Sequence, residues 1–205
     1  MTRPDFAVDE AAADAIAELF NIGMGEPAAA LSVMVGEPVV LSVPSVTVAR
    51  RADIAADVVP AVGAAAPVCA VLGSFRGPFS GEAMLVFPAG AGLALVDRLV
   101  PGGADGPDGE TARDALTEIG NIILNGCLAS FANLVEGEVE SGVPCYRAGP
   151  ADQVIGTAAD PVLFVRIDMA LESGLSHGRA LFLLEIASLD SFRDAVRRLV
   201  GGAAA

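Results

Sequence analysis

The chain contains one segment twice, displaced by 100 residues, and this repeat restricts the fold to one built from two similar halves. Aligned without a gap, residues 12–44 and 112–144 share 11 of 33 positions, whereas unrelated segments would share roughly two or three. The shared residues, numbered in the first copy, are Ala12, Asp14, Ala15, Glu18, Asn21, Ile22, Ala29, Val35, Val39, Val43 and Pro44. Burial does not explain why a Glu and an Asn recur at a fixed spacing, so the polar members point to function.

These polar members form the pattern Asp-x3-Glu-x2-Asn, followed after 22 residues by Pro. The first copy is Asp14, Glu18, Asn21 and Pro44, and the second is Asp114, Glu118, Asn121 and Pro144. On an α-helix, the Asp, Glu and Asn of each copy fall within a stripe of about 60°, which continues to Gly25 or Asn125. The apolar residues lie on the opposite side. We therefore expect two helices that pack inward and present a carboxylate and a carboxamide outward.

The order of apolar patterns is the same in both halves: a helix, three strands and a second helix. Helices are expected over 9–34, 90–100, 110–134 and 189–199, and strands over 39–48, 68–75, 82–87, 139–146, 162–169 and 179–186. Pro27 should divide the first helix into two segments that meet near residues 23–27. The predicted fold is α/β (α+β), a pseudo-twofold pair of helix-strand-strand-strand-helix halves that share a mostly antiparallel sheet, with the motif helices on one face.

The domain organisation follows from the same repeat. We expect a single domain over 1–205, made of repeats at about 9–100 and 109–200, because the Gly/Pro/Asp-rich segment 101–109 falls where one copy ends and the next begins. No long polar linker separates the copies. The uncharged run 58–75 is interrupted by Pro and Gly, so no membrane insertion is expected, and the N-terminus lacks the pattern of a signal peptide.

Charge and cysteine content limit the partners. The chain has 26 acidic residues and 12 basic residues, all Arg, for a net charge of −14. That charge opposes binding to nucleic acid or anionic lipid and favours a partner with a basic or metal-bearing surface. Cys69, Cys127 and Cys145 are odd in number and lack CxxC spacing, which favours buried, reduced thiols in a cytoplasmic protein.

Self-contained catalysis is disfavoured by the residues available. Ser32 has no matching His, and His177 stands in a Ser-His-Gly segment that resembles a turn between strands. Gly23-Met-Gly25 lacks the last glycine of a dinucleotide fingerprint, and residues 105–110 lack calcium-loop spacing. We therefore expect no cofactor and no metal bound by this chain. An exposed Glu/Asn pair can instead complete another protein's site, because a carboxamide can hold a water in line with phosphorus and a carboxylate can pair with a partner's cation.

This pattern resembles the CheC/CheX/FliY family, which hydrolyses the aspartyl phosphate of the chemotaxis response regulator CheY. The resemblance rests on both copies of the motif and on the stretch from Glu18 to Ser32, which is similar to the family's first helix. Two intact copies resemble CheC more than single-site CheX. The departure is Pro27, where the family usually has a small residue in a continuous helix.

The resemblance implies a set of roles. Glu18 and Glu118 would contact the receiver's active-site Lys, and Asn21 and Asn121 would orient the attacking water. The substrate would be a phosphorylated CheY-like receiver domain, Mg²⁺ would be supplied by that receiver, and CheD is a candidate partner. Two alternatives stay open: a non-catalytic adaptor that binds a receiver or CheD, and a flagellar switch component like FliY. FliY-type chains normally carry an additional C-terminal switch domain, and this sequence stops at Ala205, so the switch alternative is the less expected one. The phosphatase and the adaptor require the same surface, and we expect the phosphatase.

Overall fold

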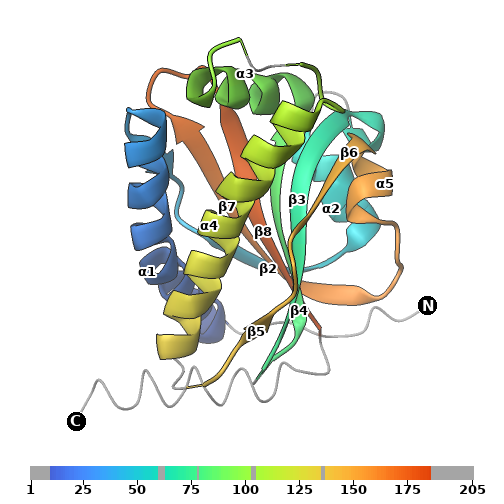
Figure 1. The fold of residues 1–205 in the computed structure, drawn as a ribbon. Helices are drawn as coiled ribbons and strands as arrows, with labels where there is room; N and C mark the ends of the chain where they lie inside the picture. Colours follow the sequence, from blue (N-terminus) through green and yellow to red (C-terminus); the bar gives the residue numbers. More distant parts are fainter. Residues whose placement is uncertain (1–9, 60–62, 78, 103–104, 135–136, 186–205) are drawn as a thin grey trace.

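The computed structural model of the protein describes residues 10–59, 63–77, 79–102, 105–134 and 137–185 (Figure 1). The elements of the first half are α1 (Glu10–Val35), β1 (Val39–Leu41), β2 (Ser45–Arg50), α2 (Arg51–Val58), the 3-10 turn η1 (Gly63–Ala65), β3 (Pro67–Arg76), β4 (Gly81–Pro88) and α3 (Ala89–Leu99). Those of the second half are α4 (Glu110–Leu134), β5 (Glu140–Ser141), β6 (Cys145–Pro150), α5 (Ala151–Ile155), β7 (Pro161–Leu171) and β8 (His177–Glu185).

All eight strands lie in one sheet, in the order β1-β7-β8-β4-β3-β5, with β2 also beside β7 and β6 also beside β3. Every pairing is antiparallel. The halves exchange their first two strands: β1 and β2 pair with β7, where Val39 is opposite Leu171, and β5 and β6 pair with β3, where Leu72 is opposite Cys145. Strands β4 and β8 pair at the centre of the sheet. The predicted fold class is confirmed.

Helices cover both faces of this sheet. The larger core joins one face to α1, α3 and α4, and the rings of Phe20, Phe131 and Phe182 meet there, with centroids 5.0 Å apart for Phe20 and Phe131 and 4.6 Å apart for Phe20 and Phe182. The smaller core joins the other face to α2 and α5 through residues such as Ile54 and Val154. The two motif helices α1 and α4 therefore lie side by side on one face, as Figure 1 shows.

The expected break in the first helix is wrong, because α1 is one helix from Glu10 to Val35 with Pro27 inside it. Packing explains the difference. Pro27 is buried, and its Cγ lies 2.8 Å from the position that a Cβ on Gly126 of α4 would occupy. The proline ring thus fills a site on the neighbouring helix that only glycine leaves open, and this tertiary contact offsets the missing backbone donor.

Three other expectations differ from the structure. The strand expected over 39–48 is two short strands, because Pro44 falls between β1 and β2, and the strand expected over 139–146 is interrupted in the same way before Cys145. The short helices α2 and α5 were not anticipated. His177 begins β8 rather than lying in a turn, although its side chain is exposed. The helix expected over 189–199 lies outside the described residues.

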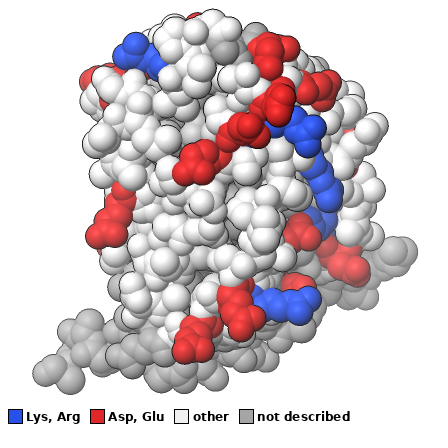
Figure 2. All heavy atoms as spheres, in the orientation of Figure 1, with Lys and Arg blue, Asp and Glu red and all other residues white. Residues whose placement is uncertain are grey.

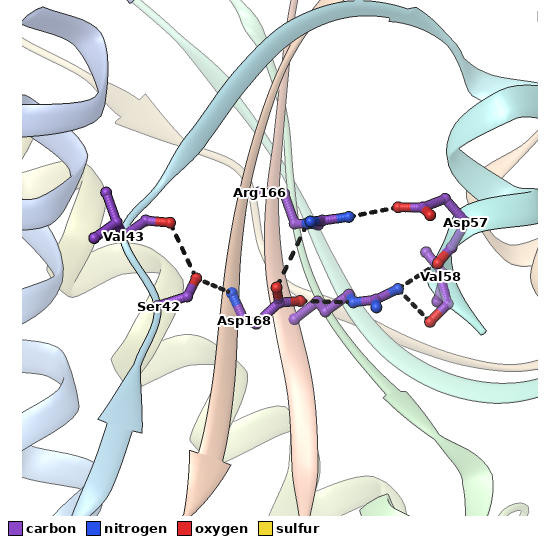
Figure 3. Close-up of polar contacts among 7 residues, drawn as sticks. Ser42, Val43, Asp57, Val58, Arg166 and Asp168 are labelled. Carbon is purple, nitrogen blue, oxygen red and sulfur yellow. Dashed lines mark hydrogen bonds and ion pairs between the residues drawn. The ribbon is translucent and has the colours of Figure 1, made fainter. Parts of the chain in front are cut away.

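Side chains from distant strands hold α2 in place (Figure 3). Arg179 donates to the backbone carbonyls of Asp57 and Val58 at the last turn of α2, and its Nε donates to Asp168 Oδ1 at 2.7 Å. Arg166 pairs with the Asp57 carboxylate at 2.5 Å. Cations near these carbonyls complement the negative end of the helix. Helix α2 has only 8 residues, and a helix this short is not stable alone in water. Its stability therefore comes from these contacts and from the apolar residues beneath it.

By length and composition, α4 is apolar enough to cross a membrane over Glu110–Asn133, and it is the one such helix among the residues described. In the fold, 44% of its apolar stretch is buried. Its apolar residues Leu116, Ile119 and Ile123 face the sheet. The apolar composition is thus that of a core helix.

Candidate functional site

The structure places the predicted stripe of each helix on the outer surface. In α1, Asp14, Glu18 and Asn21 are exposed, while Ile16 and Leu19 beneath them are buried. In α4, Asp114 and Glu118 are exposed and Asn121 is half-buried, with buried residues on the opposite side. Apolar spacing alone determines this orientation, since each helix must turn its apolar face to the sheet. The expectation of two outward-facing Glu/Asn pairs is confirmed.

The two pairs lie at opposite ends of the helix pair. In Figure 1, α1 and α4 run antiparallel, and Gly23 of α1 lies against Cys127 and Ser130 of α4. Glu18 precedes Gly23 by five residues and Glu118 precedes Cys127 by nine, in opposite directions. At 1.5 Å per residue, the two Glu positions are roughly 21 Å apart along the helix axes. The two Glu/Asn pairs are therefore well separated on the surface.

The start of α4 is held by a residue outside it. The Asp105 carboxylate accepts hydrogen bonds from the backbone amides of Thr111 and Ala112, at 3.2 and 3.3 Å. Although desolvation of this carboxyl opposes the effect, these two amide donors lower the pKa of Asp105. An anion at a helix N-terminus satisfies donors that have no partner in the helix. Asp105 thus fixes the end of α4 that carries Asp114 and Glu118.

A close contact sets the height of α4 above the sheet at the second site. Gly120, next to Asn121, packs against Val71 of β3, and a Cβ on Gly120 would lie only 2.5 Å from Val71 Cβ. In the first copy the equivalent residue is Phe20, whose ring fills the core instead. Glycine is needed at 120 because no side chain fits between helix and sheet there. The backbone that carries Asn121 is therefore supported directly by the central sheet.

The two carboxamides differ in their surroundings. Asn125 Nδ2 donates to Asn121 Oδ1 at 2.6 Å, one helical turn further along α4. The residue equivalent to Asn125 in the first copy is Gly25, which is exposed and has no heavy atom within 4 Å of the position of a Cβ. No hydrogen bond joins the Asn21 carboxamide to another of the described residues. The sequence pattern included Asn125 in the stripe but gave no sign of this contact.

The motif prolines lie in the strand interruptions and not on the helices. Pro44 is buried between β1 and β2, and Pro144 is half-buried between β5 and β6. The residues two positions earlier anchor both connections: the Ser42 amide donates to Asp168 O at 2.9 Å, and the Gly142 amide donates to Ser74 O at 2.7 Å. Each proline lies directly before the next strand, at a position where a residue that cannot donate to the ladder is tolerated. Both prolines thus act on the fold.

The surface around the two pairs is acidic. Helix α1 carries Glu10, Asp14, Glu18 and Glu26 and no basic residue, while α4 carries Glu110, Asp114 and Glu118 and one Arg. Seven acids and one Arg give the two helices a charge of −6. In Figure 2, acidic atoms run along the upper part of α4, and much of the remaining face is uncharged. Ile22, beside Asn21, is 52% exposed. Such a face attracts a cationic site and offers it apolar contact.

Within the parts of the chain that the structure describes, no three His, Cys, Asp or Glu side chains are grouped so that they could hold a metal ion. The cysteines follow the expectation only in part. Cys69 and Cys127 are buried, and burial raises the pKa of the Cys69 thiol to about 11. Cys145 is exposed, because it begins the edge strand β6 with its side chain turned from the core.

Comparison with known proteins finds similarity to flagellar-switch and chemotaxis proteins. No family model matches the chain. The chain is 27% identical over 166 residues to the flagellar motor switch phosphatase FliY of Bacillus subtilis, a match that covers 78% of this chain and 42% of that protein. It therefore spans about two fifths of the length of this curated relative.

Solved structures share the fold. Thermotoga maritima FliY superposes with a TM-score of 0.75 at 17% identity, over 95% of this chain and 100% of that one. The FliM middle domain of H. pylori gives 0.70 at 12% identity, over 92% and 99%. The chemotaxis protein CheX of Desulfovibrio desulfuricans gives 0.58 at 18% identity, over 82% and 99%. The doubled motif on two outer helices, the sequence similarity to FliY and the shared fold agree with the resemblance to the CheC/CheX/FliY family.

Proposed function

We propose that this protein is a phosphatase that hydrolyses the aspartyl phosphate of a CheY-like receiver domain in chemotaxis signalling. The observation that carries the proposal is the presence of two outward-facing Glu/Asn pairs, at Glu18 and Asn21 and at Glu118 and Asn121, on neighbouring helices of one acidic face. The phosphatase activity in the name of the similar FliY protein agrees with it.

In the proposed reaction the Glu carboxylate pairs with the active-site Lys of the receiver and fixes the register of the two proteins. The Asn carboxamide holds a water in line with phosphorus, where positioning supplies most of the catalysis. The water oxygen bonds to phosphorus while the acyl phosphate P–O bond breaks, which regenerates the receiver's carboxylate and releases dihydrogen phosphate. Mg²⁺ is supplied by the receiver, and the charge of −6 on the two helices favours approach to that cationic site.

A second function is favoured by the likeness to the FliM middle domain. In that case the same face docks a receiver, or CheD, without hydrolysis, either as an adaptor or at the flagellar switch. Both functions require an exposed acidic and carboxamide surface, so binding alone does not separate them. The difference lies in the lifetime of the phosphoryl group on the receiver.

The deciding experiment follows loss of phosphate from a panel of phosphorylated receivers with and without this protein. A shortened lifetime with at least one receiver is expected for the phosphatase, and binding with unchanged lifetimes throughout the panel would leave the adaptor. Two variants then divide the roles. Glu118→Lys should weaken binding at its site because it opposes a cation to the receiver's Lys. Asn121→Ala should leave binding nearly intact while lowering kcat. Equal loss of binding in both variants would contradict the assigned roles.

A further inference from the structure

The two copies of the motif are alike in Asp, Glu and Asn but differ one helical turn beyond the Asn. Asn125 donates to the Asn121 carboxamide across 2.6 Å. Gly25 occupies the equivalent position in the first copy and offers no side chain to Asn21. Exposure follows the same difference, since Asn121 and Asn125 are both half-buried and Asn21 is exposed.

The physical effect of this contact is on orientation. The terminal torsion of an asparagine has a broad, roughly twofold profile, so an unrestrained carboxamide exchanges its oxygen and nitrogen between two directions. In the structure the hydrogen bond from Asn125 Nδ2 holds Oδ1 in one of these two directions. One lone pair of Oδ1 and both hydrogens of Nδ2 remain free to contact a water. A pair of this kind at i and i+4 contributes little to helix stability, so its main consequence is the direction of the carboxamide.

The surrounding packing supports this restraint. Gly120 rests on Val71 of the central sheet, and Asp105 holds the first turn of α4. The backbone beneath Asn121 is therefore fixed, and Asn125 fixes the remaining torsion of the side chain. At the first site the backbone of α1 is continuous and packed through Pro27, so the missing side chain at position 25 is the difference that faces the carboxamide.

We infer that Asn125 is a positioning residue that holds the Asn121 carboxamide in the orientation needed to direct water at the receiver's phosphate, and that Gly25 leaves Asn21 without this restraint. The inference rests on the proposed phosphatase function. It makes the site at Glu118 and Asn121 the faster of the two, and the site at Glu18 and Asn21 one that binds receivers but turns them over more slowly.

The test isolates each site in the full chain. An Asn21→Ala background leaves only the second site active, and an Asn121→Ala background leaves only the first. In the Asn21→Ala background, Asn125→Ala should lower kcat about fivefold with KM unchanged, the factor that corresponds to one hydrogen bond of about 1 kcal/mol. In the Asn121→Ala background, Gly25→Asn should raise kcat by a similar factor. Gly25→Ala is the matched control, since it removes the glycine without adding a carboxamide, and it should leave kcat unchanged.

A third substitution separates direction from rigidity. Asn125→Asp keeps the size of the side chain but removes its donor. The Asn121 carboxamide must then rotate by about 180° and donate its own Nδ2 to the new carboxylate. The Asn121 side-chain amide should then stay as rigid as in the wild type by NMR order parameters, while kcat falls. Asn125→Ala should lower both the order parameter and kcat.

The outcomes are distinguishable. Absence of activity from the wild-type protein with every receiver would refute the proposed function and this inference with it. A wild-type protein that is active, with kcat unchanged in both Asn125 variants, would overturn the inference alone. So would equal kcat values for Gly25→Asn and Gly25→Ala, or an effect confined to KM. Mobility of the Asn121 amide in the wild type equal to that of Asn21 would overturn it without any kinetic measurement.

Discussion

The close contact between α4 and the sheet makes one substitution a sensitive test of the structure. In Gly120→Ala, the new methyl group would lie 2.5 Å from Val71 Cβ and Cγ1 and 2.9 Å from Cγ2. Ordinary contacts between carbon atoms are about 3.5–4.0 Å, so helix and strand must separate by about 1 Å. Val71 cannot retreat, because it is buried in β3, which is hydrogen-bonded on both sides by β4 and β6.

The expected free energy of unfolding follows from two opposing effects. Overpacking of this kind costs about 1–3 kcal/mol, and three contacts below 3 Å place the cost near 3 kcal/mol. Alanine in place of glycine in a helix raises the free energy of unfolding by about 1 kcal/mol. The net loss is then about 2 kcal/mol, which lowers Tm by about 4–8 °C in a protein of this size.

The matched control is Gly25→Ala, the same chemical change on the exposed side of α1. No heavy atom lies within 4 Å of its new methyl group, so only the helix preference remains. This variant should gain up to about 1 kcal/mol, with Tm higher by about 2–4 °C. Urea unfolding of the two variants and the wild type, fitted with a common slope, measures both changes. The two variants should change the free energy of unfolding in opposite directions. A Gly120→Ala protein as stable as the wild type would refute the packing of α4 on Val71.

Two further predictions concern other parts of the fold. Arg179→Met removes the donor to the last turn of α2 and should lower the free energy of unfolding by about 2 kcal/mol. Amide hydrogen exchange should become faster in α2 and stay unchanged in α4. Unchanged protection of α2 would contradict the role of Arg179. One thiol of the native protein should react with a disulfide reagent near neutral pH, and three should react after unfolding. Cys145 is exposed, whereas Cys69 and Cys127 are buried and burial raises the pKa of Cys69 to about 11. Rapid reaction of two thiols in the native protein would contradict this burial.

The repeat was sufficient to predict the main architecture and the orientation of the site. Helix α4 has the expected bounds, and apolar spacing alone turned Glu118 and Asn121 outward. Periodicity works here because each motif helix has one face against a sheet, which is what such patterns report.

What the sequence did not predict depends on contacts between distant residues. The continuity of α1 requires Gly126, 99 positions beyond Pro27, to leave room for the proline ring. Helix α2 requires Arg179, from a strand near the other end of the described chain. The restraint on Asn121 was hidden for another reason, since a stripe gives the face on which Asn125 lies but not the hydrogen bond that it makes.

The exchange of first strands between the halves has a consequence for synthesis. Val39 pairs with Leu171, so 171 − 39 = 132 residues must be added before β1 can complete its ladder. At typical elongation rates of 5–20 residues per second this takes roughly 7–26 s. Throughout that interval β1 and β2 carry backbone donors and acceptors without a partner, as an exposed edge does. The first repeat therefore cannot complete its share of the sheet during synthesis until β7 has been made.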